Sequence, residues 1–241
     1  MSSVTVYLAG DSTVSSYGPE QSPRAGWGQM LGRFFDETVR IANAASSGRS
    51  SKSFIDEGRL DAILRSIQAG DYLFIQFGHN DQKPDAERHT EANGSYRAYL
   101  QQYIDGARQA GAYPVLVTSV NRRSFDGRGR FVPTHDDYPE AMLQLGREQN
   151  VPVLDLCSRS EALYRMLGPE ASKTLLLWLA PGEHANYPEG EKDNTHFNET
   201  GAVQIAGLVV ELLKEAELPL VNHLKAYEPY VLGWSKEIVE N

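Results

Sequence analysis

The chain has 241 residues, of which 41% are hydrophobic, so it can bury one sizeable core, and its composition excludes a disordered or fibrous protein. Its net charge of -9 repels phosphate backbones and anionic membranes, which argues against nucleic-acid and membrane partners. We therefore expect a single domain over residues 1–241. The sequence leaves the oligomeric state open.

One cysteine, Cys157, cannot form a disulfide within the chain, and the apolar run before it places it in the core. A catalytic cysteine is the alternative, but no residue near it in the sequence resembles a base. No apolar run approaches the roughly 20 residues that a membrane span needs. The first residues lead directly into a strand pattern without a charged and apolar leader, so we expect a cytoplasmic protein.

The first predicted element is a buried strand over residues 4–9, which stops abruptly at Gly10-Asp11-Ser12. Gly10 permits a sharp turn before the Ser12 hydroxyl. Open α/β sheets bind their ligands in loops at the carboxyl ends of the strands. Ser12 is therefore a candidate nucleophile, provided that another part of the chain supplies a base.

Helical and extended patterns then alternate along the chain. They predict helices over residues 26–35, 54–68, 96–110 and 137–150, and strands over residues 38–43, 71–77, 114–120 and 151–156. Five strands that alternate with helices predict parallel βαβ units. We therefore expect an α/β protein with a three-layer α/β/α sandwich and a five-stranded parallel sheet.

The last part of the chain is predicted to be mostly helical, with one long loop. Residues 160–178 are expected to form a helix with a break near Gly168, and residues 180–190 a loop rich in proline and glycine. Asn198 can cap a closing helix that runs to about residue 216. Residues 218–241 carry aromatic side chains and are expected to pack back onto the domain.

Polar residues follow three of the predicted strands and precede the last helix: Ser12, Gly48, Asn80, Asp193 and His196. The carboxyl ends of parallel strands share one edge, so Ser12, Gly48 and Asn80 are expected to meet there. Asp193 and His196 are three residues apart, and on a turn or a 3₁₀-like step their side chains lie on one side. This predicts a triad in which His196 is the base for Ser12 and Asp193 fixes its tautomer. The N–H groups of Ser12 and Gly48 and the Asn80 amide would bind the oxyanion.

These residues resemble the four sequence blocks of the SGNH, or GDSL-like, hydrolases. Residues 10–13 resemble the first block, the loop that ends at Gly48 the second, residues 78–81 the third and residues 193–196 the last. The blocks occur in the family's order over nearly the whole chain. The resemblance implies an SGNH-hydrolase or flavodoxin-like fold and a carboxylic ester hydrolase.

Within that family the chain is most similar to the rhamnogalacturonan acetylesterases, on residues 43–50, 77–81, 181–190 and 193–197. This similarity implies removal of O-acetyl groups from the pectic backbone through an acetyl-Ser12 intermediate, without a metal or cofactor. Some secreted members carry disulfides, which a single cysteine cannot form. A cytoplasmic enzyme would act on small acetylated oligosaccharides.

Other functions stay open. A lipid-type GDSL esterase would expose an apolar acyl groove, and a carbohydrate-binding protein could keep the fold without catalysis. The presence of Ser12, Asp193 and His196 argues against the binding protein. Asp193 and His196 could instead bind a metal together with Glu183 and His184, although nothing else in the sequence supplies a ligand cluster.

Three further side chains are candidates for binding the substrate. Arg49 could bind a galacturonate carboxylate, and a solvated loop arginine is the alternative. His79 adjoins Asn80, and His184 lies in the loop over residues 180–190, so both could line the site. The remaining histidines are expected at the surface and two tryptophans in the core: His89, His135 and His223, and Trp27 and Trp178.

Overall fold

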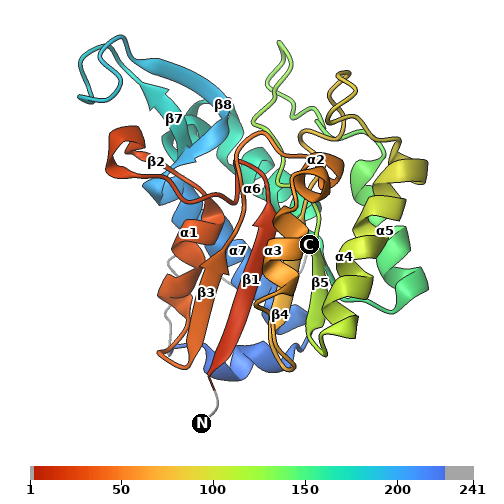
Figure 1. The fold of residues 1–241 in the computed structure, drawn as a ribbon. Coiled ribbons are helices and arrows are strands. Elements are labelled where there is room, and N and C mark those ends of the chain that lie inside the picture. Colours follow the sequence, from red (N-terminus) through yellow and green to blue (C-terminus); the bar gives the residue numbers. More distant parts are fainter. Residues whose placement is uncertain (1–2, 226–241) are drawn as a thin grey trace.

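The computed structural model describes residues 3–225 and contains a five-stranded sheet in the order β3-β1-β4-β5-β6 (Figure 1). Every neighbouring pair in this sheet is parallel. Its strands are β1 Val4–Gly10, β3 Val39–Asn43, β4 Tyr72–Gln76, β5 Tyr113–Val117 and β6 Val153–Leu154. Helices cover both faces of the sheet (Figure 1), so the predicted α/β sandwich with five parallel strands is confirmed.

The α-helices of the described chain are α1 Trp27–Met30, α2 Ser51–Asp56, α3 Arg59–Leu64, α4 Arg97–Gln109, α5 Tyr138–Gln149, α6 Leu156–Ala171 and α7 Glu199–Glu215. Shorter helical turns are η1 Pro19–Gln21, η2 Leu31–Phe34, η3 Ala92–Tyr96, η4 Ser172–Leu175 and η5 Pro219–His223. The predicted helix over residues 54–68 is divided in two. Gly58 lies between α2 and α3 with a φ of 69°, in the left-handed region that ends a helix.

Strand β4 shows how the large sheet is packed, because all five of its residues are buried. Tyr72 and Phe74 contact the core that includes α1 and α7, whereas Leu73 and Ile75 contact a second core that includes α4 and α5. Successive residues of a strand point to opposite faces, so a central strand needs apolar residues at every position. This explains the apolar run over residues 72–75, and the buried Gln76 that follows is hydrogen-bonded to Trp27 and Thr13.

A second sheet of three antiparallel strands, in the order β2-β8-β7, lies at the upper left of Figure 1, beyond the carboxyl ends of the large sheet. Its strands are β2 Arg24–Ala25, β7 Leu176–Leu179 and β8 Glu191–Asn198. The predicted helix over residues 160–178 is wrong at its end. Gly168 has a non-helical φ of 70°, α6 ends three residues later, and the buried Leu176 pairs with Phe197 of β8.

The predicted fifth strand over residues 151–156 is shorter in the structure, where β6 has two residues. Helix α6 begins at Leu156 and not at residue 160. The reason is a helix cap: the Asp155 Oδ1 accepts a hydrogen bond from the Ser158 N–H at 3.2 Å. A short polar side chain after two apolar residues therefore starts a helix where the sequence pattern predicts an extended chain.

The end of the described chain packs on the domain. Leu220 is buried, and Leu224 forms an isolated antiparallel bridge with Phe35. The rest of the segment that was expected to pack back, residues 226–241, lies outside the described residues. Between residues 3 and 225 no helix is long and apolar enough to cross a bilayer.

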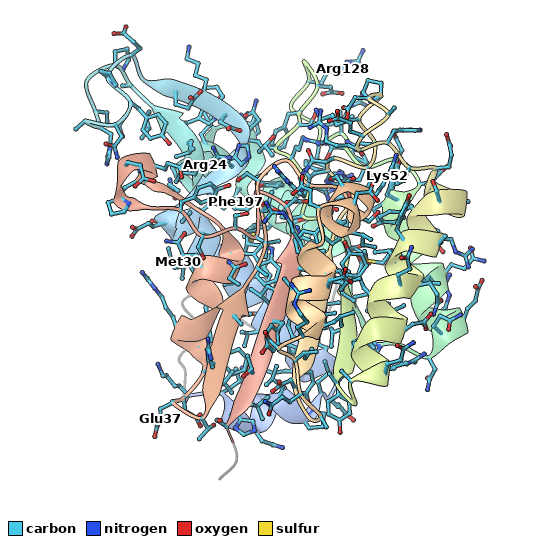
Figure 2. The ribbon with its side chains drawn as sticks, in the orientation of Figure 1. Arg24, Met30, Glu37, Lys52, Arg128 and Phe197 are labelled. Atoms are coloured by element: carbon cyan, nitrogen blue, oxygen red, sulfur yellow. The ribbon has the colours of Figure 1, made fainter. Side chains whose placement is uncertain are left out.

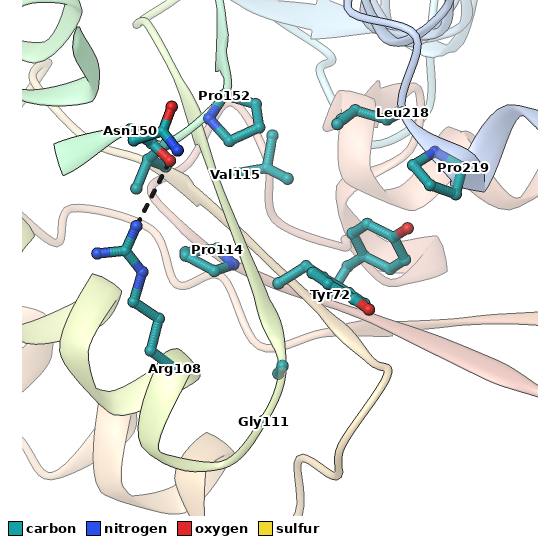
Figure 3. Close-up of a pocket in the computed structure, with 12 residues that line it drawn as sticks. Tyr72, Arg108, Gly111, Pro114, Val115, Asn150, Pro152, Leu218 and Pro219 are labelled. Atoms are coloured by element: carbon teal, nitrogen blue, oxygen red, sulfur yellow. Dashed lines mark hydrogen bonds between the residues drawn. The ribbon is translucent and has the colours of Figure 1, made fainter.

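A cavity of about 410 Å³ lies at the amino-terminal edge of the large sheet (Figure 3). Its walls include Tyr72 and Tyr113, the first residues of β4 and β5. Arg108 borders it and donates from Nη2 to the Asn150 carbonyl at 3.4 Å. Because Ser12 follows the carboxyl end of β1, the cavity and Ser12 are at opposite edges of the parallel sheet.

Two glycines of α7 give a matched test of the packing. A Cβ on Gly201 would lie 1.8 Å from the Leu175 carbonyl oxygen, whereas a Cβ on Gly207 would lie 3.7 Å from Phe34 Cζ. This contact can be relieved only by moving α7 or the backbone of η4, so we expect Gly201→Ala to lower the free energy of unfolding by about 1–3 kcal/mol. Gly207→Ala should leave it unchanged or raise it by up to about 1 kcal/mol, through helix propensity. Urea unfolding measures the free energy of unfolding of both variants. Equal values for the two would contradict the close contact between Gly201 and the Leu175 carbonyl.

Candidate active site

Ser12 lies in a tight turn directly after β1. The Asp11 Oδ1 holds this turn by accepting hydrogen bonds from Thr13 N at 2.9 Å and from Thr13 Oγ1 at 2.8 Å. Gly10 is required because a Cβ on it would lie 2.7 Å from Val14 Cγ2. Asp11 and Thr13 are buried and Ser12 is half-buried, so the turn presents the Ser12 hydroxyl at the carboxyl edge of the sheet.

The structure brings Ser12, His196 and Asp193 together in one hydrogen-bonded chain. Ser12 Oγ lies 2.9 Å from His196 Nε2, and His196 Nδ1 lies 2.5 Å from Asp193 Oδ2. A proton on Nδ1 is then bound by the carboxylate, which leaves Nε2 as the acceptor for the serine hydroxyl. This is the order of groups that activates a serine as a nucleophile.

Asp193 and His196 belong to β8 but lie outside its regular ladder. Trp178 pairs with Lys192 and Leu176 with Phe197, so the four residues 193–196 of β8 face the single residue 177 of β7. Such a bulge re-aims side chains away from the pleat. The Asp193 Oδ1 accepts the N–H groups of Thr195 at 2.7 Å and His196 at 3.0 Å, which turns the chain so that both side chains meet. From the sequence we expected Asp193 and His196 on a turn or a 3₁₀-like step. We did not predict that this turn lies within a strand.

Asp193 stays ionised over the whole working range of pH. Burial by itself would raise the pKa of this carboxyl, but the hydrogen bond and charge of the His196 ring and the two backbone N–H groups outweigh burial and lower the pKa to about 2. A permanent negative charge beside Nδ1 favours the positive imidazolium that forms when His196 takes a proton.

The loops after β3 and β4 meet beside Ser12. Asn80 Nδ2 donates to the Arg49 carbonyl at 3.0 Å, which uses one of its two N–H hydrogens. Gly48, one residue before Arg49, has a φ of 81°, a conformation that favours glycine. Ser46 N donates to the Gly10 carbonyl at 3.0 Å, which joins this loop to the turn that carries Ser12.

Asp81 anchors these loops, although the sequence assigned it no role. Its carboxylate accepts hydrogen bonds from Ser51 N at 3.0 Å, Ser51 Oγ at 2.5 Å and Thr90 Oγ1 at 3.1 Å. Burial raises the pKa of Asp81 to about 7, against the opposing effect of these donors. Ser51 is the first residue of α2, so Asp81 fixes the end of the loop that contains Gly48. The available signal was a carboxylate in the polar segment 78–81, which follows β4 and also contains Asn80.

Tyr17 is a second residue near the site whose role the sequence patterns do not predict. Its hydroxyl donates to the Ser12 carbonyl at 2.6 Å and lies 3.1 Å from Ser47 Oγ. The Arg24 guanidinium lies 4.5 Å from the centre of its ring. Tyr17 therefore joins the Ser12 turn, the loop after β3 and the start of the small sheet.

The three candidate substrate-binding side chains are placed differently. Arg49 pairs through Nε with Glu57 at 2.9 Å and donates from Nη1 to the Ser47 carbonyl. His79 is buried, and desolvation, followed by the nearby His135 and Arg122, lowers its pKa well below the ordinary value. His184 is in the loop over residues 180–190, and its Nδ1 accepts the Asn186 N–H at 3.2 Å. In residues 3–225 no hydrogen bond joins these three to the Ser12, His196 or Asp193 side chains, and no group of three His, Cys, Asp or Glu is placed to bind a metal.

Three expectations about burial are corrected. His135, expected at the surface, is buried with its ring 4.4 Å from that of His79, and desolvation lowers its pKa to about 4. Trp178, expected in the core, is half-buried, with Arg123 at 5.2 Å and Lys173 at 4.5 Å from its ring centre. Cys157 is also half-buried, and desolvation raises the pKa of its thiol to about 12. Trp27 is in the core as predicted.

Known proteins with similar sequences cover nearly the whole chain. The chain is 51% identical to the Bacillus subtilis rhamnogalacturonan acetylesterase RhgT over 93% of its length and 96% of that protein. It is 43% identical to the probable rhamnogalacturonan acetylesterase YesY of the same organism, over 91% of its length and 96% of that protein.

Solved structures of other proteins have the same fold as this chain. The crystal structure of Bacillus subtilis YxiM aligns with a TM-score of 0.77 at 32% identity, over 90% of this chain and 58% of that one. An acetyl-xylooligosaccharide esterase from Geobacillus aligns with a TM-score of 0.60 at 16% identity over 91% of this chain and 97% of that one, which supports the fold alone. Residues 8–203 match the GDSL-like Lipase/Acylhydrolase family. The chain therefore belongs to the GDSL-like lipase/acylhydrolase family and is a carboxylic ester hydrolase.

Proposed function

We propose that this protein is a serine esterase that removes O-acetyl groups from oligosaccharides derived from rhamnogalacturonan. The hydrogen-bonded chain from Ser12 through His196 to Asp193 carries the proposal, because it supplies a nucleophile, a base and an orienting carboxylate in reach of one another. The substrate class rests on similarity to the two Bacillus proteins named as rhamnogalacturonan acetylesterases.

The first half of the reaction forms an acyl-enzyme. Ser12 Oγ attacks the acetyl carbonyl carbon while its proton moves to His196 Nε2, and the carbonyl oxygen becomes an oxyanion. The backbone N–H groups of Ser12 and Gly48 and the free amide hydrogen of Asn80 bind that oxyanion. The intermediate collapses when His196 returns the proton to the sugar oxygen, which leaves as an alcohol. Acetyl-Ser12 remains.

The second half repeats these steps with water. His196 accepts a proton from a water molecule, and the resulting hydroxide attacks the acetyl-Ser12 carbonyl carbon. The second tetrahedral intermediate breaks its bond to Ser12 Oγ and releases acetic acid, which ionises to acetate in water, while His196 returns its proton to Ser12 Oγ. Asp193 keeps its negative charge throughout, since its pKa is about 2, and stabilises the imidazolium in both halves. This cycle needs no group from outside the chain except water and the ester.

On the sugar side of the site, Arg49 is the candidate for binding a galacturonate carboxylate. Its guanidinium already pairs with Glu57, so a uronate would bind by sharing or displacing that carboxylate. Exposed pairs of this kind contribute only about 0–1 kcal/mol, so the exchange has a low cost. The proposed substrates are short acetylated oligosaccharides, and the proposed location is the cytoplasm.

A comparison of acetate release tests the proposed substrate. We expect higher kcat/KM on acetylated rhamnogalacturonan oligomers than on acetylated xylan oligomers or long-chain p-nitrophenyl esters. Preference for long acyl chains would support a lipid-type esterase instead, and sugar binding without acetate release would support a binding protein. Fractionation of the native host, together with a comparison of oligomer and intact polymer, checks the expected location and substrate size.

Replacing the nucleophile tests the mechanism. Ser12→Ala should lower kcat on p-nitrophenyl acetate by about 10⁶-fold, the loss that follows removal of a triad serine, while the fold stays intact. A fluorophosphonate should add once, at Ser12, as peptide mass spectrometry would report. The exposed serine variant Ser66→Ala is the control and should behave as wild type. Labelling at another residue, or an active Ser12→Ala protein, would refute the mechanism.

Asn80→Ala tests the oxyanion site. If the Asn80 amide donates to the oxyanion, kcat should fall about 10² to 10³-fold, which is typical for one such donor. KM should hardly change, because the negative oxygen develops in the transition state and the tetrahedral intermediate and is absent from the bound ester. Steady-state kinetics separates the two, and thermal unfolding checks that loss of the bond to Arg49 has not disordered the loop. A change in KM alone would mean that Asn80 only positions the substrate.

A further inference from the structure

The segment 193–196, which carries Asp193 and His196, lacks the backbone hydrogen bonds that a regular strand would make. Residues 193–196 face one residue of β7, so their backbone groups are not held by a continuous ladder. Asn194, between the two side chains of the pair, is exposed. The alignment of Asp193 and His196 with Ser12 must therefore depend on contacts from outside the small sheet's ladder.

Those contacts come from Arg123 and Trp178, which both bind Asn194. The Arg123 N–H donates to the Asn194 carbonyl at 2.8 Å, and Arg123 Nη1 donates to Asn194 Oδ1, also at 2.8 Å. Trp178 Nε1 donates to the same Oδ1 at 3.0 Å. Main chain and side chain of Asn194 are thus fixed by three donors from two different parts of the chain.

Arg123 is itself held firmly. Its Nε donates to Ser172 Oγ at 3.0 Å and to the Pro169 carbonyl at 3.2 Å, and its guanidinium lies 5.2 Å from the centre of the Trp178 ring. Ser172 Oγ in turn donates to the Gly168 carbonyl at 2.6 Å. The guanidinium plane therefore connects the non-helical end of α6 to the bulge of β8. Figure 2 shows Arg128, which lies in the same loop between β5 and α5 as Arg123, above the carboxyl edge of the large sheet.

We propose that Arg123 is a positioning residue, which fixes Asn194, with the help of Trp178, so that Asp193 and His196 stay aligned with Ser12. Arg123 touches neither the ester nor the reacting atoms. Its rigid fork can bind the Asn194 oxygen and the Pro169 carbonyl at the same time, whereas a lysine ammonium lacks that planar geometry. This inference rests on the proposed function, because it concerns the same three reacting residues.

Kinetics on p-nitrophenyl acetate tests the role. Arg123→Ala and Asn194→Ala should each lower kcat by about 10-fold to 100-fold with KM unchanged within about twofold, since small misplacement of reacting groups costs up to about 10²-fold. Trp178→Phe keeps the ring but removes one donor, so its loss should be smaller. Arg123→Lys should recover only part of the activity. Arg130→Ala is the control, since this arginine is on the same loop with a side chain 68% exposed, and it should retain wild-type kcat.

Double variants separate positioning from a general loss of structure. Arg123→Ala combined with Asn194→Ala should lose no more than the larger single loss, and Arg123→Ala should cost little in a His196→Ala background, where there is no base left to align. If Arg123→Ala does not fold, Trp178→Phe and Asn194→Ala carry the same test. Wild-type kcat in Arg123→Ala and Asn194→Ala, or an equal loss in the His196→Ala background, would overturn the positioning role. Activity that survives Ser12→Ala would instead overturn the proposed function.

Discussion

The hydrogen bond between Ser12 Oγ and His196 Nε2 joins residues that are 184 positions apart, and the rest of the structure serves to keep that distance at 2.9 Å. Ser12 belongs to the large sheet and His196 to the small one. Phe197, the next residue, is fully buried between the two sheets (Figure 2) and pairs with Ala25 of β2. Because β2 leads into α1, and α1 contacts both α7 and β3, the small sheet is tied to the large one.

This arrangement buries two carboxylates, and their burial costs free energy. Desolvation raises the pKa of Asp11 to about 6 and that of Asp81 to about 7, so both are in surroundings that disfavour their charge. Each is retained where it orders a loop: Asp11 shapes the turn at Ser12, and Asp81 binds the first turn of α2. A buried charge of this kind stabilises a fold less than apolar side chains of similar size would. The contribution of Asp11 and Asp81 is therefore the ordering of the two loops.

We could predict the large sheet because the hydrophobic pattern of the sequence extends over whole strands. In β4, for example, every residue is buried, and each is either apolar or hydrogen-bonded through its side chain. The small sheet was not. Its β7 continues an apolar run that fits a helix equally well, and only the pairing of Leu176 with Phe197, which is distant in sequence, decides between them. For the site, the motifs predicted which residues meet, since carboxyl ends of parallel strands share an edge. The supports at Tyr17 and Arg123 were beyond prediction, because each depends on which distant carbonyl or side-chain amide folding brings into reach.

The chain supplies its reactive groups from opposite ends, and this orders events during synthesis. Ser12 leaves the ribosome early, but it has no base until β8 has been made and has paired with β2. Until then it is an ordinary hydroxyl, with no group to take its proton. In the proposed mechanism, a nascent chain that lacks β8 therefore cannot use Ser12 to attack an ester. Hydrolysis through Ser12 would begin only after β8 has joined the small sheet, so it would report the formation of that sheet.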